Sequence, residues 1–144
     1  PDARPLRAVL DDVVETDLGE YESLTVEYDG EAFDYRVYGG DLLDSVFTNV
    51  ITNAAVHNEG EVHVRISLSE GADSVTVTIA DDGAGIPDAI ADRLFEMGAK
   101  GPDSDGTGFG LGFAKALTES YGGDISVEES EYGGAEFRIE LERV

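Results

Sequence analysis

Asp81 is the residue of this chain whose type and setting most clearly suggest chemistry. It closes an apolar, strand-like stretch, and Gly83 and Gly85 follow two and four positions later. Glycine lets the backbone turn tightly and approach a planar ligand, and a buried carboxylate can accept a hydrogen bond from an exocyclic amine. A plain hairpin turn is the alternative, because Asp-Gly is its usual signal. Ile86 and Pro87 disfavour that alternative, since no strand pattern resumes after them.

Two asparagines four residues apart, Asn49 and Asn53, fall on one face of a predicted helix, and His57 continues the row by another turn. An amide oxygen is a hard, neutral ligand that suits a Mg²⁺ ion bridging phosphate groups. Taken alone, the row could be two asparagines that face solvent on an amphipathic helix. The motifs that follow it in the chain favour a metal ligand instead.

A third group of residues, Gly106, Gly108 and Gly110, accompanies a helix predicted to start near Phe109. Unpaired backbone N–H groups and the positive end of that helix would face the loop, which makes the segment a candidate phosphate cradle. Dinucleotide-binding folds share this spacing, but there a strand leads into the glycines. Residues 96–105 have the composition of a loop, so we reject the dinucleotide interpretation.

The two lysines of the chain, Lys100 and Lys115, both fall beside these glycines. We expect Lys100 to contact phosphate, because it lies in the loop itself. Lys115 falls within the following helix, where it could simply cap or decorate that helix.

Apolar residues at helical spacing predict the helices that position these side chains. The helix of the asparagines starts near Asp41, and between residues 42 and 56 its apolar positions recur every three to four residues. A short amphipathic helix is predicted over residues 5–14, and another runs from Gly110 to a stop at the glycine pair 122–123.

Alternating apolar residues predict the strands, two of them joined by a hairpin around residues 71–73 and two others around Asp29 and Gly30. The elements together predict an α/β two-layer sandwich, in which about three helices cover one face of a mixed, mostly antiparallel sheet. Residues 96–108 nearly lack apolar side chains and are expected to form a mobile loop. The predicted strand segments are 24–26, 33–37, 62–68, 75–79, 125–127 and 137–141.

The composition excludes several classes of protein. An apolar content of 41% argues against a disordered chain, and no apolar run approaches the roughly 20 residues of a membrane span. The formal net charge of −23 disfavours nucleic acid and anionic membranes as partners, because both are bound through Lys and Arg. Zero cysteines exclude disulfides and thiolate metal sites.

The acidic residues are dispersed along the chain and do not form a single block. This pattern favours a halophile's cytoplasm, where salt screens the self-repulsion of the charges. An ordinary acidic mesophilic protein is the alternative. The chain starts at Pro1 without an initiator Met, so we interpret it as a piece of a longer protein.

The order of the motifs carries a resemblance to a known superfamily. Residues 49–55, 81–87, 106–112 and 133–137 resemble the N, G1, G2 and closing GT-type boxes of the GHKL ATP-binding proteins. That superfamily unites gyrase, the ninety-kilodalton heat-shock chaperone, the mismatch-repair ATPase and sensor histidine kinases. The resemblance runs from about Tyr38 to Leu141 and implies a Bergerat fold with a mobile ATP lid.

The resemblance also implies roles for individual residues. Asn53 matches the Mg²⁺ ligand, with Asn49 as a further possible one; Asp81 matches the aspartate that bonds the N6 amine of adenine; and Phe95 matches the aromatic residue that seats the lid. The other residues implied to bind ATP are His57, Gly83, Gly85, Ile86, Lys100, Gly106, Thr107, Gly108, Phe109, Gly110, Leu111 and Ala135.

Three positions depart from the commoner pattern of the family. Gly98 stands where a second Phe is usual, Val56 where many relatives carry a phosphate-contacting Lys, and Ala135 where a Thr is usual. These departures bear on phosphate affinity and lid order more than on adenine binding.

Asn49 discriminates between hydrolysis and phosphotransfer. In the gyrase, chaperone and mismatch-repair branches, a Glu four residues before the metal-binding Asn activates water as a general base. An amide cannot accept that proton, so Asn49 argues against ATP hydrolysis. Phosphoryl transfer to a partner group remains open, because positioning and charge neutralisation carry most of that reaction. The implied function is the catalytic domain of a two-component sensor histidine kinase. A serine/threonine kinase of the anti-sigma type and a degenerate ATP-sensing module are the alternatives.

The phosphoacceptor is expected on a separate domain, because neither His57 nor His63 is followed by the family's acceptor motif. Residues 1–20 are interpreted as a helical or linker segment from an upstream domain, and residues 21–144 as the ATP-binding catalytic domain. The implied partners are the protein's own dimerisation and histidine-phosphotransfer domain, its sensor domain and a response regulator. Nucleic acid and direct membrane contact are not expected. The expected location is the cytoplasm, in a parent protein that a membrane anchor could hold.

Overall fold

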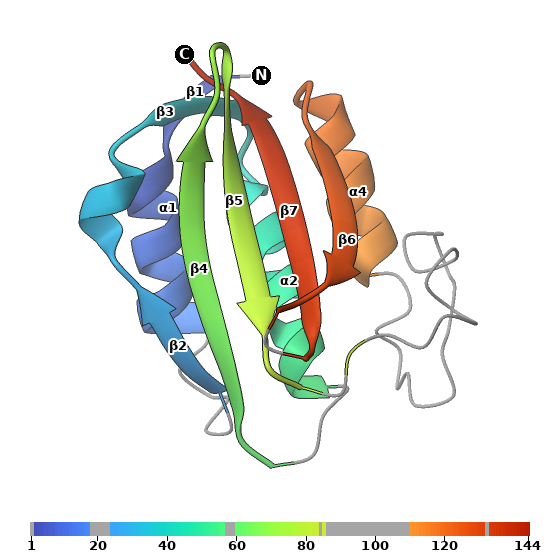
Figure 1. Ribbon diagram of the computed structural model, residues 1–144. Coiled ribbons are helices and arrows are strands. Elements are labelled where there is room, and N and C mark those ends of the chain that lie inside the picture. The colour runs from blue at the N-terminus through green and yellow to red at the C-terminus, as the bar shows by residue number, and fades with distance from the viewer. Residues whose placement is uncertain (1, 18–23, 57–59, 84, 86–109, 132) are drawn as a thin grey trace.

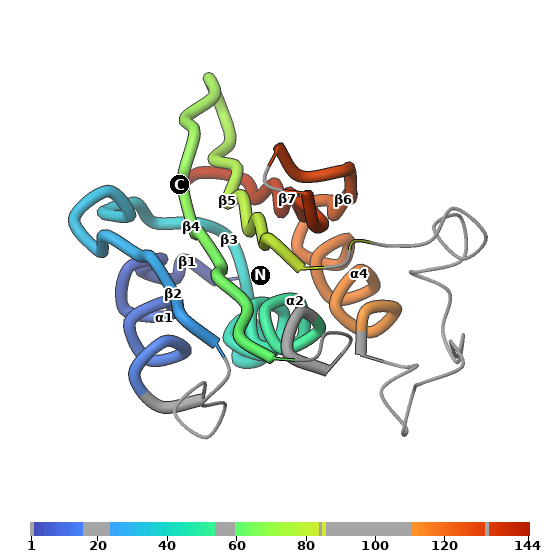
Figure 2. The backbone as a smooth tube through the Cα atoms, turned by 60° about the horizontal axis from the view of Figure 1, so that its bottom comes forward, coloured from blue at the N-terminus to red at the C-terminus, as the bar shows by residue number. Residues whose placement is uncertain are grey.

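The computed structural model describes residues 2–17, 24–56, 60–83, 85, 110–131 and 133–144. Figure 1 shows a twisted sheet in front of the helices, and Figure 2 shows the helices gathered along one side of that sheet. These helices are α1 (Leu6–Asp12), α2 (Leu43–Val56) and α4 (Gly110–Ser120). The predicted two-layer α/β sandwich is therefore confirmed. The predicted lid lies outside the described residues.

The larger sheet has five strands in the order β2-β4-β5-β7-β6. Strands β2 and β4 pair in parallel, whereas the other neighbouring pairs are antiparallel, so the sheet is mixed and mostly antiparallel as predicted. Buried and more exposed residues alternate along most of β4, β5 and β7, which turns one face of the sheet toward the helices. The strand bounds are β2 (Leu24–Tyr28), β4 (Val62–Glu70), β5 (Ser74–Asp81), β6 (Asp124–Glu129) and β7 (Ala135–Glu142).

The predicted hairpin around Asp29 is wrong. The Asp29 side chain accepts a hydrogen bond from the Glu31 N–H and starts a 3-10 turn, η2 (Gly30–Phe33), so no two-residue hairpin turn forms. That turn buries Phe33, whose ring centroid lies 5.1 Å from that of Tyr28. The strand β3 (Arg36–Gly39) then pairs with β1 (Asp2–Pro5) in a separate two-stranded sheet.

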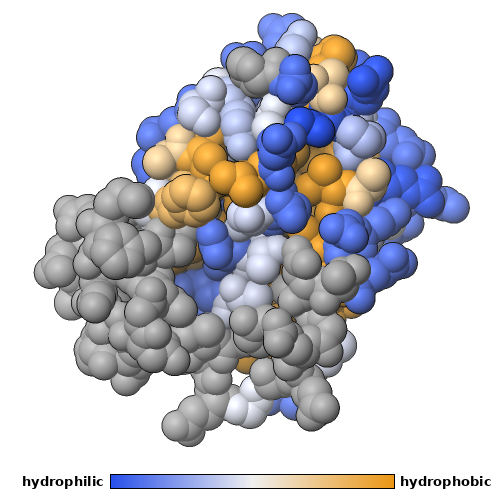
Figure 3. Space-filling view, turned by 180° about the vertical axis from the view of Figure 1, so that it is seen from behind, coloured by the Kyte–Doolittle hydropathy of each residue, from blue (hydrophilic) through white to orange (hydrophobic). Residues whose placement is uncertain are grey.

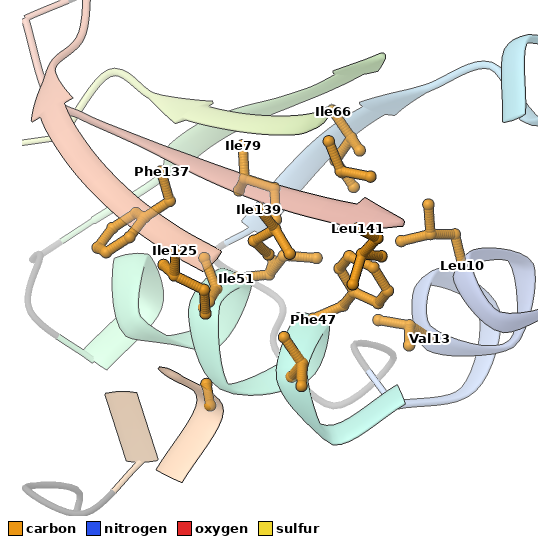
Figure 4. Packing of buried hydrophobic residues seen from close by; sticks show 14 of the residues in the cluster. Leu10, Val13, Phe47, Ile51, Ile66, Ile79, Ile125, Phe137, Ile139 and Leu141 are labelled. Carbon is orange, nitrogen blue, oxygen red and sulfur yellow. The ribbon is translucent and has the colours of Figure 1, made fainter. Parts of the chain in front are cut away.

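The hydrophobic core fills the space between the sheet and the helices (Figure 4). Phe47 and Ile51 of α2 lie in one buried cluster with Ile139 and Leu141 of β7, and the apolar spacing of α2 predicted this buried stripe. Leu10 of α1 and Val13 of the following π-helical turn, η1 (Val13–Asp17), belong to the same cluster. The N-terminal helix therefore shares one core with the sheet.

Polar contacts also join α1 to the rest of the fold. The Tyr28 hydroxyl on β2 donates a hydrogen bond of 2.6 Å to Asp11 Oδ1, and Arg7 Nη1 lies 3.3 Å from Asp34 Oδ1. Burial, followed by the hydrogen bond to Asp11, raises the pKa of Tyr28 far above its ordinary value, so the hydroxyl keeps its proton and remains a donor. These contacts fix α1 against β2 and the turn that follows it.

The outer surface is dominated by charge. Figure 3 shows the helix-covered face, on which hydrophilic side chains surround a central apolar area. The ion pairs of the described residues involve solvent-accessible side chains, as between Arg65 and Glu27 at 3.6 Å or Arg143 and Glu70 at 2.9 Å. Such pairs add little stability each, and 9 basic residues cannot neutralise 32 acidic ones.

We expect the stability of the domain to rise with salt. Raising KCl from about 0.1 M to about 1 M shortens the Debye length from about 10 Å to about 3 Å, which screens repulsion among the excess carboxylates. The midpoint of thermal unfolding should increase by roughly 5 °C or more, since about 1 kcal/mol already shifts a domain of this size by several degrees. Sucrose at matched osmolality controls for solute exclusion. A midpoint that is flat across KCl would contradict the expectation.

Candidate functional site

Two glycine-rich segments that are far apart in the sequence meet at one end of the sheet. Asp81 is the last residue of β5, and Ala135 is the first residue of β7. The register pairs Ala80 with Glu136, which brings Asp81 beside Ala135. Figure 1 shows both strand ends at the lower edge of the sheet, the same end at which α2 finishes and α4 begins.

The Asp81 side chain is held by backbone donors from both segments. It is 6% exposed, as expected for a carboxylate at the end of a buried strand. The N–H of Gly83 donates to Asp81 Oδ1 at 2.9 Å, and the N–H of Ala135 donates to the same oxygen at 3.2 Å. Within the described part of the chain, no group donates to Oδ2. Backbone N–H groups thus fix one carboxylate oxygen, whereas the other accepts no hydrogen bond from the described residues.

Gly134 packs so closely on Asp81 that a side chain has no room there. A Cβ at this position would overlap Asp81 Oδ1, and would lie 2.5 Å from the Asp81 carbonyl oxygen and 2.7 Å from the Gly83 nitrogen. Gly85 has a φ of +80°, and a Cβ there would lie 3.4 Å from the Gly133 carbonyl oxygen. Glycine backbone therefore packs directly against the carboxylate, in a place that a side chain at position 134 would occupy.

Burial dominates the electrostatics of Asp81. It raises the pKa of this carboxyl above the ordinary value; the N–H groups of Gly83 and Ala135 oppose the shift, and the charge of Asp82 adds to it. Because the folded-state pKa lies above the unfolded one, the carboxyl favours folding at low pH, and this contribution is lost as the pH rises through the folded-state pKa. The ionised carboxylate therefore does not stabilise the folded state, as expected for a group that binds a ligand.

The neighbouring Asp82 has a different setting. Its side chain is exposed, its Oδ1 accepts a hydrogen bond of 2.8 Å from the His63 N–H, and its own N–H donates to the His63 carbonyl oxygen at 3.2 Å. Asp82 thus extends the pairing of β4 with β5 by one residue. Of the two adjacent aspartates, Asp81 is the candidate ligand group.

Asn49 and Asn53 lie one turn apart on α2, as predicted. Both side chains are half-buried, between the buried Val50 and Ile51 on one side and solvent on the other. The Thr52 hydroxyl beside them is directed back to the helix, where it donates to the Thr48 carbonyl oxygen at 2.7 Å. The asparagine amides are therefore the polar groups that this part of α2 offers to a ligand or metal.

The helix α4 starts at Gly110, close to the predicted position, and Leu111 is buried at its first turn. Lys115 extends to β6, where its Nζ donates to Asp124 Oδ1 at 2.8 Å and to the Ile125 carbonyl oxygen at 3.2 Å. These bonds tie α4 to the neighbouring strand β6, so Lys115 does more than cap or decorate its own helix. The candidate residues that lie outside the described part of the chain are His57, Ile86, Phe95, Lys100, Gly106, Thr107, Gly108 and Phe109.

Sequence reasoning missed the part played by Gly134. Resemblance alone assigns the glycine pair at 133 and 134 to the closing box and Ala135 to ATP binding. The structure shows backbone contacts from both Gly134 and Ala135 to Asp81. A glycine at the start of a buried strand is the signal that could have indicated such an approach.

Comparison with known families identifies the chain. Residues 39–144 match the family described as histidine kinase-, DNA gyrase B-, and HSP90-like ATPases. The chain belongs to this family. The match includes Asp81, both asparagines and the closing glycines, so the resemblance inferred from the motifs is confirmed.

Two similar proteins are sensor proteins by name, and one of them is named a histidine kinase. The sensor histidine kinase AruS of Pseudomonas aeruginosa is 39% identical over 109 residues, which cover 69% of this chain and 11% of that protein. The heme sensor protein HssS of Staphylococcus saprophyticus is 36% identical over 104 residues, covering 72% of this chain and 23% of that protein. The chain therefore spans less than a quarter of the length of these relatives.

Solved structures share the fold over nearly the full chain. The mycobacterial sensor histidine kinase MprB has a TM-score of 0.85 at 21% identity, with 99% of this chain and 98% of that chain covered. The ATP binding domain of PrrB from Mycobacterium tuberculosis has a TM-score of 0.78, also at 21% identity, with 99% and 96% covered.

None of the helices in the described ranges has the length and apolar character needed to span a membrane.

Proposed function

We propose that this domain binds ATP with Mg²⁺ and presents the γ-phosphate to a histidine on a separate dimerisation domain of a two-component sensor kinase. The observation that carries the proposal is the Asp81 carboxylate, buried, fixed by two backbone N–H groups and walled by glycine backbone. The family match and the names of the relatives support the kinase reaction.

The residues present fit the nucleotide. Asp81 accepts the exocyclic amine of adenine, and Gly134 and Gly85 let the two backbone segments pack closely beside that carboxylate. The start of α4 at Gly110 provides backbone N–H groups suited to phosphate.

The amide oxygen of Asn53 holds Mg²⁺, with Asn49 as a second possible ligand. The ion supplies charge neutralisation on the phosphates. No carboxylate stands at position 49 to take a proton from water, so the domain favours transfer of phosphate to a partner over hydrolysis.

The partners follow from the same reaction. A dimerisation domain provides the acceptor histidine, a sensor domain controls its access to the nucleotide, and a response regulator receives the phosphate. We place the domain in the cytoplasm, where ATP is available. The relatives AruS and GtrS are named sensor histidine kinases, which favours histidine over the serine acceptor of an anti-sigma kinase.

Calorimetric titration of the 144-residue chain tests the binding step. In about 1 M KCl, chosen to screen the excess charge, ATP with Mg²⁺ should bind saturably and GTP should bind far more weakly. Labelled ATP is then supplied together with the dimerisation helices of the parent protein. The label should reach histidine, giving an acid-labile phosphoprotein, whereas an acid-stable product would indicate serine. Absence of ATP binding would count against the proposal, and binding without transfer would favour a nucleotide-sensing module.

A further inference from the structure

The hydrogen bonds at Asp81 are divided unequally between its two oxygens. The Gly83 and Ala135 N–H groups converge on Oδ1 from two segments that are 54 residues apart in the sequence. A carboxylate oxygen that accepts two backbone N–H bonds cannot rotate away without leaving both donors unpaired in a buried place. The orientation of the side chain is therefore fixed by the start of β7 as well as by the turn after β5.

Gly134 completes the clamp. Its Cα approaches Asp81 so closely that a Cβ would overlap Oδ1, and the Asp81 carbonyl oxygen and the Gly83 nitrogen close the space behind it. The Ser130 N–H bonds to the Gly134 carbonyl oxygen at 2.8 Å, and the Gly133 N–H bonds to the Ser130 carbonyl oxygen at 3.0 Å. This tight turn between β6 and β7 sets the position of Gly134.

We propose that Gly134 and the Ala135 N–H are positioning elements that hold Asp81 in one orientation, so that Oδ1 serves the protein and Oδ2 alone reads the base. The inference rests on the proposed adenine binding and adds to it the cause of the selectivity. The clamp makes the site selective for 6-aminopurines, because an oxygen with no hydrogen accepts from an amine and is repelled by a 6-oxo group.

Asp81→Asn tests the fixed orientation. In a clamped side chain, the amide oxygen must occupy the Oδ1 position facing the two N–H donors, which forces the NH₂ group into the Oδ2 position. D81N should then bind ATP about tenfold or more weakly and bind inosine triphosphate, which carries a 6-oxo group, more tightly than the unsubstituted domain does. In an unclamped side chain, the amide would flip and keep its preference for ATP.

Gly134→Ala tests the positioning element, and Gly123→Ala is its matched control. A Cβ at Gly123 would overlap the carbonyl oxygen of Glu140 on β7. Both variants therefore introduce a steric clash with backbone atoms. Glu140 pairs with Thr76 of β5, which lies five residues before Asp81 on that strand. The contact at Gly123 is therefore roughly 16 Å from Asp81 along β5. Both variants should lose stability, but G134A alone should reduce the ratio of ATP to inosine triphosphate affinity, by about tenfold.

The decisive readout for binding is that ratio, measured by calorimetry at a temperature where each variant is folded. A ratio that falls in D81N and G134A but not in G123A supports the clamp. A ratio that is unchanged in D81N, or an equal loss for both nucleotides, overturns it.

A second measurement needs no nucleotide and so separates the clamp from the proposed function. In the free domain, the amide proton resonances of Gly83 and Ala135 should shift together as the Asp81 carboxyl titrates. The shared shift should disappear in D81N and G134A and persist in G123A. Independent behaviour of the two amides in the unsubstituted domain would overturn the clamp even if ATP binds, and a shared titration would support it even if ATP does not.

Discussion

A chain that begins at residue 21 is expected to lose the cooperative unfolding transition of the 144-residue chain. The deletion removes Leu6, Leu10 and Val13, all of which are 0% exposed and lie in the same core as α2 and the sheet. Truncating one buried Leu to Ala already costs about 2–5 kcal/mol, and a whole domain is stable by only about 5–15 kcal/mol. The deletion also removes the contacts that α1 makes with α2.

Urea unfolding followed by near-ultraviolet circular dichroism measures this effect. A milder variant, Leu10→Ala, should fold but lower the unfolding free energy by about 2–5 kcal/mol. Glu15→Ala, at an exposed position in the following turn, is the control and should change stability little. A shortened chain with an unchanged midpoint and slope would show that α1 is dispensable.

The result bears on where the catalytic domain begins. The division into residues 1–20 and 21–144 stays a prediction, and the family match itself begins at residue 39. The contacts of α1 nevertheless favour including it in the folding unit: Tyr28 bonds to Asp11, and β1 pairs with β3. The N-terminal segment packs on α2, the helix that carries both asparagines.

Much of the fold could be predicted because its signals are local. Apolar alternation in β4 and β5 and the helical spacing of α2 depend only on neighbouring residues, and both predictions are confirmed. The hairpin at Asp29 failed because the same Asp-Gly pair can start a 3-10 turn when the aspartate caps it. The parallel pairing of β2 with β4 depends on partners 38 residues apart, as for Leu24 and Val62, and no local pattern indicates it.

The candidate site, too, could be predicted only as far as local signals reach. The residue type of Asp81 and its position after an apolar stretch suggested a ligand group, and the structure confirms that Asp81 is buried at the end of β5. The contact with Gly134 could not be predicted, because it depends on the register of β5 with β7. The sequence gives side-chain identities, whereas the groups that fix Asp81 are backbone N–H groups, which every residue except proline carries.

Replacing Asn53 by alanine is expected to remove the Mg²⁺-dependent part of ATP binding and nearly all phosphotransfer. The amide is half-buried on α2, one turn beyond Asn49, and metal bound there would neutralise phosphate charge. Loss of one such stabilising group slows the transfer step by on the order of a hundredfold or more. Asp81, the proposed adenine contact, lies on another element, so ATP binding without metal should be unchanged.

Titration of ATP in Mg²⁺ and in chelator measures the two contributions separately. Thr52→Ala is the matched control, because the Thr52 hydroxyl already bonds to the Thr48 carbonyl oxygen and is not offered to a ligand. An equal loss of ATP affinity with and without metal would reject the ligand role of Asn53. The same titration on Asn49→Ala then distinguishes a metal-ligand role of Asn49 from a role in phosphotransfer. A metal-dependent loss there would make Asn49 a second ligand, whereas an effect on transfer alone would place it beside the reacting phosphate.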